Sequence, residues 1–374
     1  MKFSASSSAL TSRLTAISRV INPKSINPIL QDFLFRTEGP KLVITASDND
    51  TTLETEVELS ESEKDAQIAI PAKTLLDALK EIPEQPLSFD INDDTQEITI
   101  KYMNGQYVLI GHNADEYPLP AVTAVDCTNV QVNAQVFQTG IARCLFAVAD
   151  DELRPVMNGI YLDMNTDGIT FVASDGHKLV CNRNMDFHAE GKASFILPKR
   201  PAALIKALID NETESVGISF DNRISVITVH NFRMVSRLIE GRYPNYNSVI
   251  PQNNPHKLTI DRQTMVNALK RVSVFSPASS GLVKLRIQEG QLEISTQDLD
   301  FSTSANESLA CMYEGMPMSI GFKAGFLIDI LNNTPGQEIV FQLADPSRAG
   351  VVVPAQQEEN ESLLMLLMPM VLND

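Results

Sequence analysis

The residues best suited to acid–base chemistry stand in one short segment, Ser174-Asp175-Gly176-His177-Lys178-Leu179. An aspartate close to a histidine could in principle move a proton. Asp-Gly is first of all a tight-turn signal between strands, however, and no nucleophile or third catalytic member accompanies the pair. The chain also lacks a phosphate-binding glycine-rich loop, an HExxH motif and a CxxC motif, and its five histidines are scattered. We therefore interpret the segment as a turn and expect no catalytic site, metal or cofactor.

The cysteines and the hydropathy of the chain indicate its setting. Four cysteines stand without paired or metal-ligand spacing: Cys127, Cys144, Cys181 and Cys311. They fit free thiols in a reducing cytoplasm. No stretch approaches the roughly 18 apolar residues of a membrane span, and the opening MKFSASSSAL lacks the apolar core of a signal peptide. We expect a cytoplasmic protein with no membrane partner.

The chain repeats one pattern three times. Residues 29–48, 157–175 and 281–298 each read as an apolar strand, a polar turn with Gly, and a second strand that ends in an aspartate. These exit aspartates, Asp48, Asp175 and Asp298, are 127 and 123 residues apart. Two more marker sets keep the same period: Ile70-Pro71-Ala72-Lys73, Leu197-Pro198-Lys199-Arg200 and Gly321-Phe322-Lys323, and the prolines Pro118, Pro244 and Pro369. A period of about 125 residues suits one independently cored domain and excludes a short-repeat solenoid.

Each repeat contains the same order of elements. Apolar residues at three- and four-residue steps predict helices over 9–21, 135–149 and 262–275, and a second helix follows each Lys-bearing marker. Short segments with two-residue alternation, separated by Asn-Gly, Asp-Gly and Glu-Gly, predict strands. Many strands with two helices per repeat indicate an α+β fold, with both helices on one face of antiparallel sheet. We expect domains over 1–122, 128–250 and 251–374, with linkers near 120–128 and 248–256.

The net charge of −17 seems to exclude nucleic acid, but the distribution of charge reverses that conclusion. Six windows around the predicted helices hold 12 basic and 5 acidic residues, whereas the rest of the chain holds 18 basic and 42 acidic residues. If the helices line one surface, that surface can hold phosphates while the rest repels them. The alternative is that these cations simply populate solvated helix faces.

Three stretches far apart in the chain resemble one family. SDGHKL at 174–179, LIEGRYPNY at 238–246 and MPMVL at 368–372 are similar to the signature stretches of the bacterial sliding clamp, the β subunit of DNA polymerase III. The resemblance covers the whole chain, including its length and triplication. It implies a head-to-tail homodimer that forms a six-domain ring, with twelve helices lining a hole through which double-stranded DNA passes. Loading would require a separate ATP-driven clamp loader.

The resemblance also implies DNA contacts. Lys24 matches a basic loop position, and Lys73, Lys199 and Arg200 match residues that face the channel. Helix placement adds Lys206, Arg271 and Lys323. These contacts need be only weak and independent of sequence, because a closed ring cannot leave DNA sideways. Asp151 stands where the family has an uncharged polar residue near the channel.

A second implied surface is an apolar cleft between the second and third domains. It would bind a linear motif of the polymerase III α subunit, the clamp loader, other polymerases and repair proteins. The matching positions are Met157, Ser174, Gly176, His177, Lys178, Leu179, Pro244, Val249, Leu366, Leu367, Met368, Pro369, Met370 and Leu372. LLMLLMPM is too apolar for a free tail, and flexible methionines suit varied peptides, although a plain core role would explain them too. Ser248, Val371 and the extension Asn373-Asp374 depart from the family pattern.

The third implied surface joins the two subunits. An edge strand of the first domain would pair with the third domain of the second copy. Tyr107 and Leu109 match one side of the small apolar cluster there, and Val274 and Phe275 match the other. Because the contact closes after two subunits, it leaves no edge free for further association.

Two other classes of protein fit the sequence less well. An enzyme with its site between repeats would need a paired acid, a nucleophile or a metal set, which we do not find. A scaffold built as an adhesin or carbohydrate-binding module would normally carry an export signal and often disulfides. A monomeric mass would favour the scaffold, since a ring requires two copies.

Overall fold

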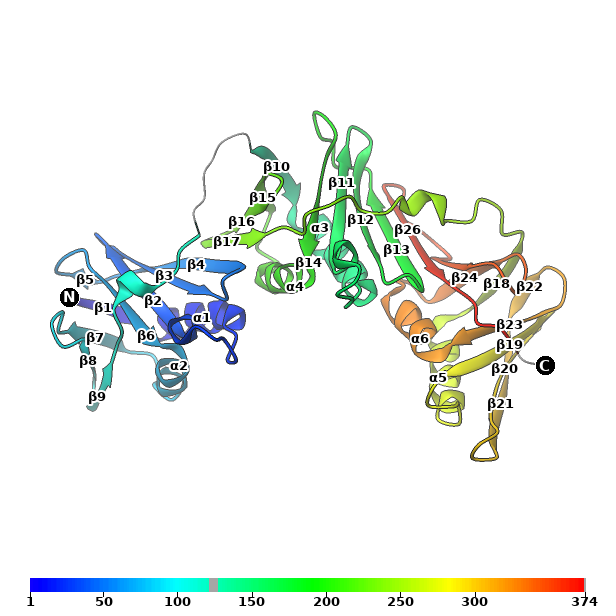
Figure 1. The fold of residues 1–374 in the computed structure, drawn as a ribbon, viewed down its shortest axis with the longest axis horizontal. Coiled ribbons are helices and arrows are strands. Elements are labelled where there is room, and N and C mark those ends of the chain that lie inside the picture. Colours follow the sequence, from blue (N-terminus) through cyan, green and yellow to red (C-terminus); the bar gives the residue numbers. More distant parts are fainter. Residues whose placement is uncertain (121–126, 373–374) are drawn as a thin grey trace. The chain divides into compact units, whose positions relative to one another are not determined.

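The structure is a computed structural model that describes residues 1–120 and 127–372 (Figure 1). The predicted linker over 120–128 lies mostly outside the described residues, as does the extension Asn373-Asp374. The chain divides into two compact units. The first comprises Met1–Phe137 and Ala203–Leu238, and the second comprises Gln138–Ala202 and Ile239–Asp374.

The described residues form six α-helices, two for each repeat. They are α1 (Ser7–Ile17), α2 (Ala72–Lys80), α3 (Ala134–Cys144), α4 (Lys199–Leu208), α5 (Arg262–Ser273) and α6 (Ala324–Asn333). All six predicted helices are present. The predictions over 9–21 and 135–149 were too long, because α1 and α3 tighten into single 3₁₀ turns at Ser18–Val20 and Leu145–Ala147.

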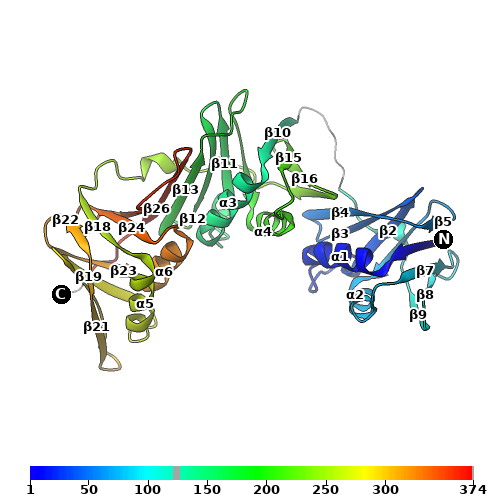
Figure 2. The same ribbon diagram turned by 180° about the vertical axis from the view of Figure 1, so that it is seen from behind.

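Side chains next to the helices explain where they begin. The Ser6 Oγ accepts the Ala9 N–H at 3.2 Å before α1, and the Asp261 Oδ1 accepts the Thr264 N–H at 2.7 Å before α5. Pro71 precedes α2 at the N-cap position, with φ of −51°. Helix α1 packs against α2, β3 and β4, and α5 packs against α6 (Figures 1 and 2).

The first unit contains two antiparallel sheets, ordered β5-β1-β7-β8-β9 and β10-β15-β16-β17-β4-β3-β2-β6. Their strands are β1 (Lys2–Ser6), β2 (Asp32–Glu38), β3 (Lys41–Ser47), β4 (Thr51–Glu58), β5 (Glu61–Ser62), β6 (Gln67–Pro71), β7 (Pro86–Ile91), β8 (Glu97–Tyr102), β9 (Gly105–Ile110), β10 (Thr128–Asn133), β15 (Ser215–Phe220), β16 (Ile224–Val229) and β17 (Phe232–Arg237). The rings of Phe3 and Phe89 stack at 4.6 Å in the core beneath α1.

The second unit contains sheets ordered β14-β11-β12-β13-β26-β25-β24-β18-β22 and β21-β20-β19-β23. Their strands are β11 (Gly159–Asn165), β12 (Gly168–Ser174), β13 (Lys178–Asn184), β14 (Ala193–Pro198), β18 (His256–Asp261), β19 (Leu282–Gln288), β20 (Gln291–Asp298), β21 (Thr303–Ala310), β22 (Met312–Glu314), β23 (Met318–Lys323), β24 (Glu338–Leu343), β25 (Gly350–Pro354) and β26 (Glu361–Leu367). The buried rings of Phe322 and Phe341 lie 5.3 Å apart in its core.

The exit aspartates of the three repeats accept the same pair of backbone hydrogen bonds. The Oδ1 of Asp175 accepts the N–H groups of His177 and Lys178, both at 2.9 Å. Asp48 and Asp298 likewise each accept the N–H groups two and three residues further on. This bonding fixes a chain reversal after each hairpin's first strand. The recurring aspartate is therefore a structural marker of the repeat.

Candidate functional site

Two strand pairs join one repeat to the next, and we call them the closed joints. In the first unit β4 pairs with β17, and the Arg237 N–H donates to the Asp50 carbonyl at 2.8 Å. In the second unit β13 pairs with β26, and the Met368 N–H donates to the His177 carbonyl at 2.8 Å. The sheets thus cross the repeat boundaries, which the sequence did not reveal. The site stretches 174–179 and 366–368 meet at the second closed joint.

Lys178 stabilises the turn of the second closed joint through its side chain. Its side chain is only 6% exposed, and its Nζ donates to the Asp175 Oδ2 at 2.6 Å. Burial alone would raise the pKa of Asp175, but the hydrogen bonds from Lys178 and His177 outweigh it and bring that pKa below its usual value. Gly176 supplies the φ of +90° that the turn requires, and His177 remains exposed.

Phe326 of α6 belongs to this site, although the sequence did not single it out. The Lys178 Nζ lies 4.1 Å from the centre of its ring, and the His177 ring lies 5.9 Å away. The Lys323 Nζ lies 4.7 Å from the same ring, so Lys323, predicted as a DNA contact, stands beside the turn. These distances fit cation–π contacts. The helical spacing of Phe326 resembles that of any core residue, which is why no sequence signal marked it.

The stretch 238–246 meets 174–179 and the end of β26 in an apolar cluster. Leu179, Leu366 and Tyr243 pack together with Val172, and the Tyr243 ring stacks on Tyr161 at 4.8 Å. The cluster lies on one face of the sheet at the second closed joint. Two of the three signature stretches therefore pack together in the fold, and the third, 368–372, begins next to them with the Met368 N–H bound to the His177 carbonyl.

The other predicted cleft residues lie around this cluster or farther along the C-terminal segment. Leu367 is buried, Met157 is buried beside Val156 of the cluster rim, and Ser174 is buried with its hydroxyl donating to the Lys178 carbonyl at 2.9 Å. Exposed or partly exposed residues are Pro244, Val249, Met368, Pro369, Met370 and Leu372. The Met370 N–H donates to the Gly321 carbonyl at 2.8 Å, which carries Leu372 onto β19 and β20 rather than onto the cluster.

The predicted DNA-contacting cations differ in how they are held. Lys24 is exposed in the loop after the 3₁₀ turn Ser18–Val20, and Lys199 and Arg200 are exposed at the start of α4. Lys73 pairs with Asp77 at 2.7 Å, one turn along α2. Arg271 pairs with Glu307 of β21 through two contacts, one of them Nε to Oε2 at 3.0 Å. Lys206 is half-buried near the end of α4.

Two further helical cations serve the fold itself. The Arg143 guanidinium donates to the Asn182 Oδ1 at 2.9 Å and pairs with Glu361, so it ties α3 to both strands of the second closed joint. Arg262 donates to the carbonyls of Gly336 and Leu331 at the end of α6. The helical charge count therefore overstates the number of cations free to meet a phosphate. Asp151 is also engaged, by the Arg154 Nε at 2.8 Å.

The predicted subunit contacts lie on unpaired sheet edges and at a helix end. Strand β9, with Tyr107 and Leu109, is an edge strand of its sheet, and β21 is an edge strand in the second unit. Val274 and Phe275 follow α5 and are 77% and 43% exposed. Such apolar edges favour association with another chain.

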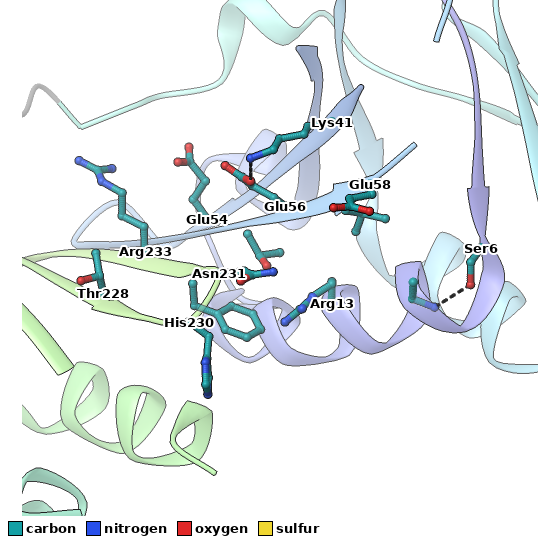
Figure 3. A pocket seen from close by; sticks show the side chains of 14 residues that line it. Ser6, Arg13, Lys41, Glu54, Glu56, Glu58, Thr228, His230, Asn231 and Arg233 are labelled. Atoms are coloured by element: carbon teal, nitrogen blue, oxygen red, sulfur yellow. Dashed lines mark hydrogen bonds and ion pairs between the residues drawn. The ribbon is translucent and has the colours of Figure 1, made fainter. Parts of the chain in front are cut away.

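A cavity of about 790 Å³ lies in the first unit, away from the three signature stretches (Figure 3). It opens where β4 continues beyond its last pair with β17, Thr55 with Phe232. The Arg13 guanidinium lies 5.1 Å from the centre of the Phe232 ring, and Lys41 pairs with Glu56 at 2.5 Å. The charges in the cavity are mixed and partly paired, and they define no ligand.

The remaining reactive side chains include four cysteines. The four cysteines are free, and burial raises the pKa of Cys144 well above its ordinary value and that of Cys181 to about 12. Within residues 1–120 and 127–372, no three His, Cys, Asp or Glu side chains are grouped closely enough to hold a metal ion. Over the same residues, no helix is long and apolar enough to cross a membrane.

Comparison with known proteins identifies the family. Models of the N-terminal, central and C-terminal domains of the DNA polymerase III beta subunit match residues 1–121, 131–245 and 247–371. The beta sliding clamp of Pseudomonas putida is 25% identical over 99% of this chain and 100% of its own length. The beta sliding clamp of Staphylococcus aureus is 25% identical, with 99% of each chain covered. The crystal structure of the Pseudomonas aeruginosa beta subunit matches with a TM-score of 0.93 and 24% identity over the full length of both chains.

The fold and the three-domain match define the class of three-domain clamp proteins. The chain belongs to the DNA polymerase III beta subunit family, the sliding clamps. The family is the non-catalytic processivity factor of that polymerase. The predicted fold class and family are confirmed.

Proposed function

We propose that two copies of this chain close head to tail into a ring around double-stranded DNA and tether a replicative polymerase to it. The observation that carries this proposal is the pair of closed joints. Each joins the strand after an exit turn to the last strand of a neighbouring repeat. The corresponding strands that remain are β21 and β9, and both are free edges. A second copy would pair them, and after two copies no edge would be left.

The ends of the first helices support the same arrangement. Val20, Ala147 and Phe275 stand at equal distances from the starts of α1, α3 and α5. Val20 and Ala147 have no exposed surface, whereas Phe275 is 43% exposed. Phe275 is therefore the one of these three apolar side chains that a second copy could bury. Tyr107 and Leu109 of the second copy would cover Phe275 and its neighbour Val274.

For the DNA contact we propose Lys24, Lys199 and Arg200 as the main cations. All three are exposed, and they lie in a loop or at a helix start where flexible side chains can follow a sliding duplex. We propose Lys73 and Arg271 as further contacts, and each is paired with a carboxylate of its own chain. Lys206 and Lys323 would play a secondary part.

For the peptide-binding site we propose the face of the second closed joint that carries the apolar cluster. His177 and Met368 are exposed there and Pro369 is half-buried, next to the buried Leu179 and Leu366. A solved relative from Pseudomonas aeruginosa is bound to griselimycin, with a TM-score of 0.92 to this chain. The occupants here would be linear motifs of the polymerase α subunit, the clamp loader, other polymerases and repair proteins in the cytoplasm.

The test is retention on DNA after loading by the cognate loader with ATP. Nicked circular DNA is compared with the same DNA after linearisation. We expect the protein to persist on the circle and to leave the linear molecule through its ends. Equal loss from both would mean that DNA is bound by ordinary contacts, and the ring would have to be abandoned.

A further inference from the structure

The turn between β20 and β21 differs from its counterparts in the other two repeats. After the exit aspartate the chain runs through residues 299–302 before β21 begins, whereas only residues 49–50 precede β4 and only residues 176–177 precede β13. The longer turn carries Leu299 and Phe301, whose side chains are 77% and 78% exposed. The preceding strand β19 pairs with β20 only as far as Ser295, and the other two repeats end this pairing at the same distance from their exit aspartates, at Thr45 and Val172. Two large exposed apolar side chains at this tip indicate a contact surface.

The closed joints show what lies beside this turn when a sheet is completed. In both, a carbonyl of the turn accepts the N–H at the end of the incoming strand, from Arg237 in one and from Met368 in the other. Phe232 begins β17 and pairs with Val229, and Gly105 begins β9 and pairs with Tyr102 in the same way. Arg237 lies five residues after Phe232, so its equivalent in β9 is Ile110, five residues after Gly105. Ile110 is 56% exposed, and its neighbour Val108 is exposed too.

We propose that Leu299 and Phe301 of one copy pack against Val108 and Ile110 of a second copy, and we call this contact the apolar clasp. It rests on the proposed ring and adds to it a contact that the closed joints do not make. There the turns carry Asn49-Asp50 and Gly176-His177, with no large apolar side chain. An interface that forms between separate chains must overcome the entropy of association, which the joints within one chain do not face. The added apolar area offsets that cost.

The chemistry of the turn argues against other occupants. Asp298 and Asp300 flank Leu299, so a phosphate backbone would be repelled rather than held. Val108 and Ile110, in contrast, offer apolar side chains to the turn. They lie on β9, an edge strand whose backbone can also pair with another strand. A second copy of this chain is therefore the partner that fits.

The experiment is a double-mutant cycle on the dimer dissociation constant, measured by sedimentation over a dilution series. The variants are Phe301→Ala, Ile110→Ala and the two combined. We expect each single change to raise the dissociation constant roughly tenfold, and the combined change to raise it by clearly less than the product. Single changes without effect, or a combined effect equal to the product, would overturn the clasp.

Met316→Ala is the matched control, because Met316 is also an exposed apolar residue of the third repeat but lies beyond β22. It should leave the dissociation constant unchanged. Thermal unfolding of each variant checks that the fold is intact, and the substituted side chains are exposed. If the unaltered chain stays monomeric at every concentration, the ring itself fails. If it dimerises but ignores Phe301 and Ile110, only the clasp fails.

Discussion

The two closed joints share one backbone plan and differ in side chains. In the first, the exposed pair Asp50 and Arg237 lies beside the turn, 3.6 Å apart. In the second, Lys178 is buried against Asp175 and Phe326, and an apolar cluster lies on one face of the sheet. The backbone pairing alone completes a sheet, so it recurs wherever repeats meet. The proposed peptide site requires an apolar surface as well, and the second joint carries the apolar cluster around Leu179 and Leu366.

The largest expected difference is between a substitution inside a closed joint and the equivalent substitution at the open edge. Ala147→Asp buries an unpaired carboxylate in the second unit, and we expect it to lower the free energy of unfolding by more than about 4 kcal/mol. Phe275→Asp alters the equivalent exposed position, and it should give folded monomers. Chemical denaturation and sedimentation separate the two outcomes. A Phe275→Asp variant that still sediments as a dimer would refute the proposed subunit contact.

Exchange of one residue between the joints tests what makes the second one different. Lys178→Thr introduces the residue that Thr51 supplies in the first joint. It leaves the carboxylate of Asp175 without its cation, at a cost of about 3 kcal/mol in stability. We expect the affinity for a clamp-binding-motif peptide to fall roughly tenfold, measured by calorimetry. Lys192→Thr, on the exposed loop before β14, is the control, and equal peptide binding by both variants would contradict the role of Lys178.

A similar pair of variants tests the difference between cations that hold the fold together and cations that are exposed. Arg143 is held by the second closed joint, whereas Lys24, Lys199 and Arg200 are exposed. Replacing the latter three by Ala should weaken DNA retention and lower the slope of log affinity against log salt by about 2–3. The control removes Lys101, Lys192 and Lys257, which lie outside the helices. An unchanged slope in the first variant would remove these residues from the DNA contact.

The smallest expected effect is a pH dependence. The folded state lowers the pKa of Asp175, so its contribution to stability is complete above the ordinary range near pH 4 and disappears as pH falls through the lowered value. Asp175→Asn should therefore cost about 1–2 kcal/mol at neutral pH and progressively less in acid. Urea denaturation from pH 7 to pH 3 measures this. A difference between the two proteins that stays constant down to pH 3 would show that the charge of Asp175 is not involved.

Sequence spacing alone predicted much of the architecture correctly. The helices followed from apolar residues at three- and four-residue steps, and the hairpins from Gly-containing turns, because both patterns reflect local backbone geometry. The exit aspartates proved to be turn formers, with the same hydrogen bonds in each repeat. The limits of α1 and α3 were less accurate, since a 3₁₀ turn leaves no distinct sequence pattern.

The site depended more on tertiary structure. The sequence singled out SDGHKL, LIEGRYPNY and MPMVL through a family resemblance. The pairing of β13 with β26 brings SDGHKL to the chain just before MPMVL, and Tyr243 of LIEGRYPNY packs against this joint. Which cations are free was also undecided by sequence. Arg143 and Lys199 look alike in a helical pattern, yet one is tied to Asn182 and Glu361 and the other begins α4 in solvent.

The sequence by itself determined three copies of one α+β repeat, because periodicity and turn chemistry act over short distances along the chain. Only the tertiary structure decided which edges close within the chain and which stay open. Strand pairing between repeats is set by how whole sheets meet, and no local pattern in β4, β17, β9 or β21 encodes it. The same is true of Phe326, whose place beside Lys178 arises from the packing of α6 against the sheet.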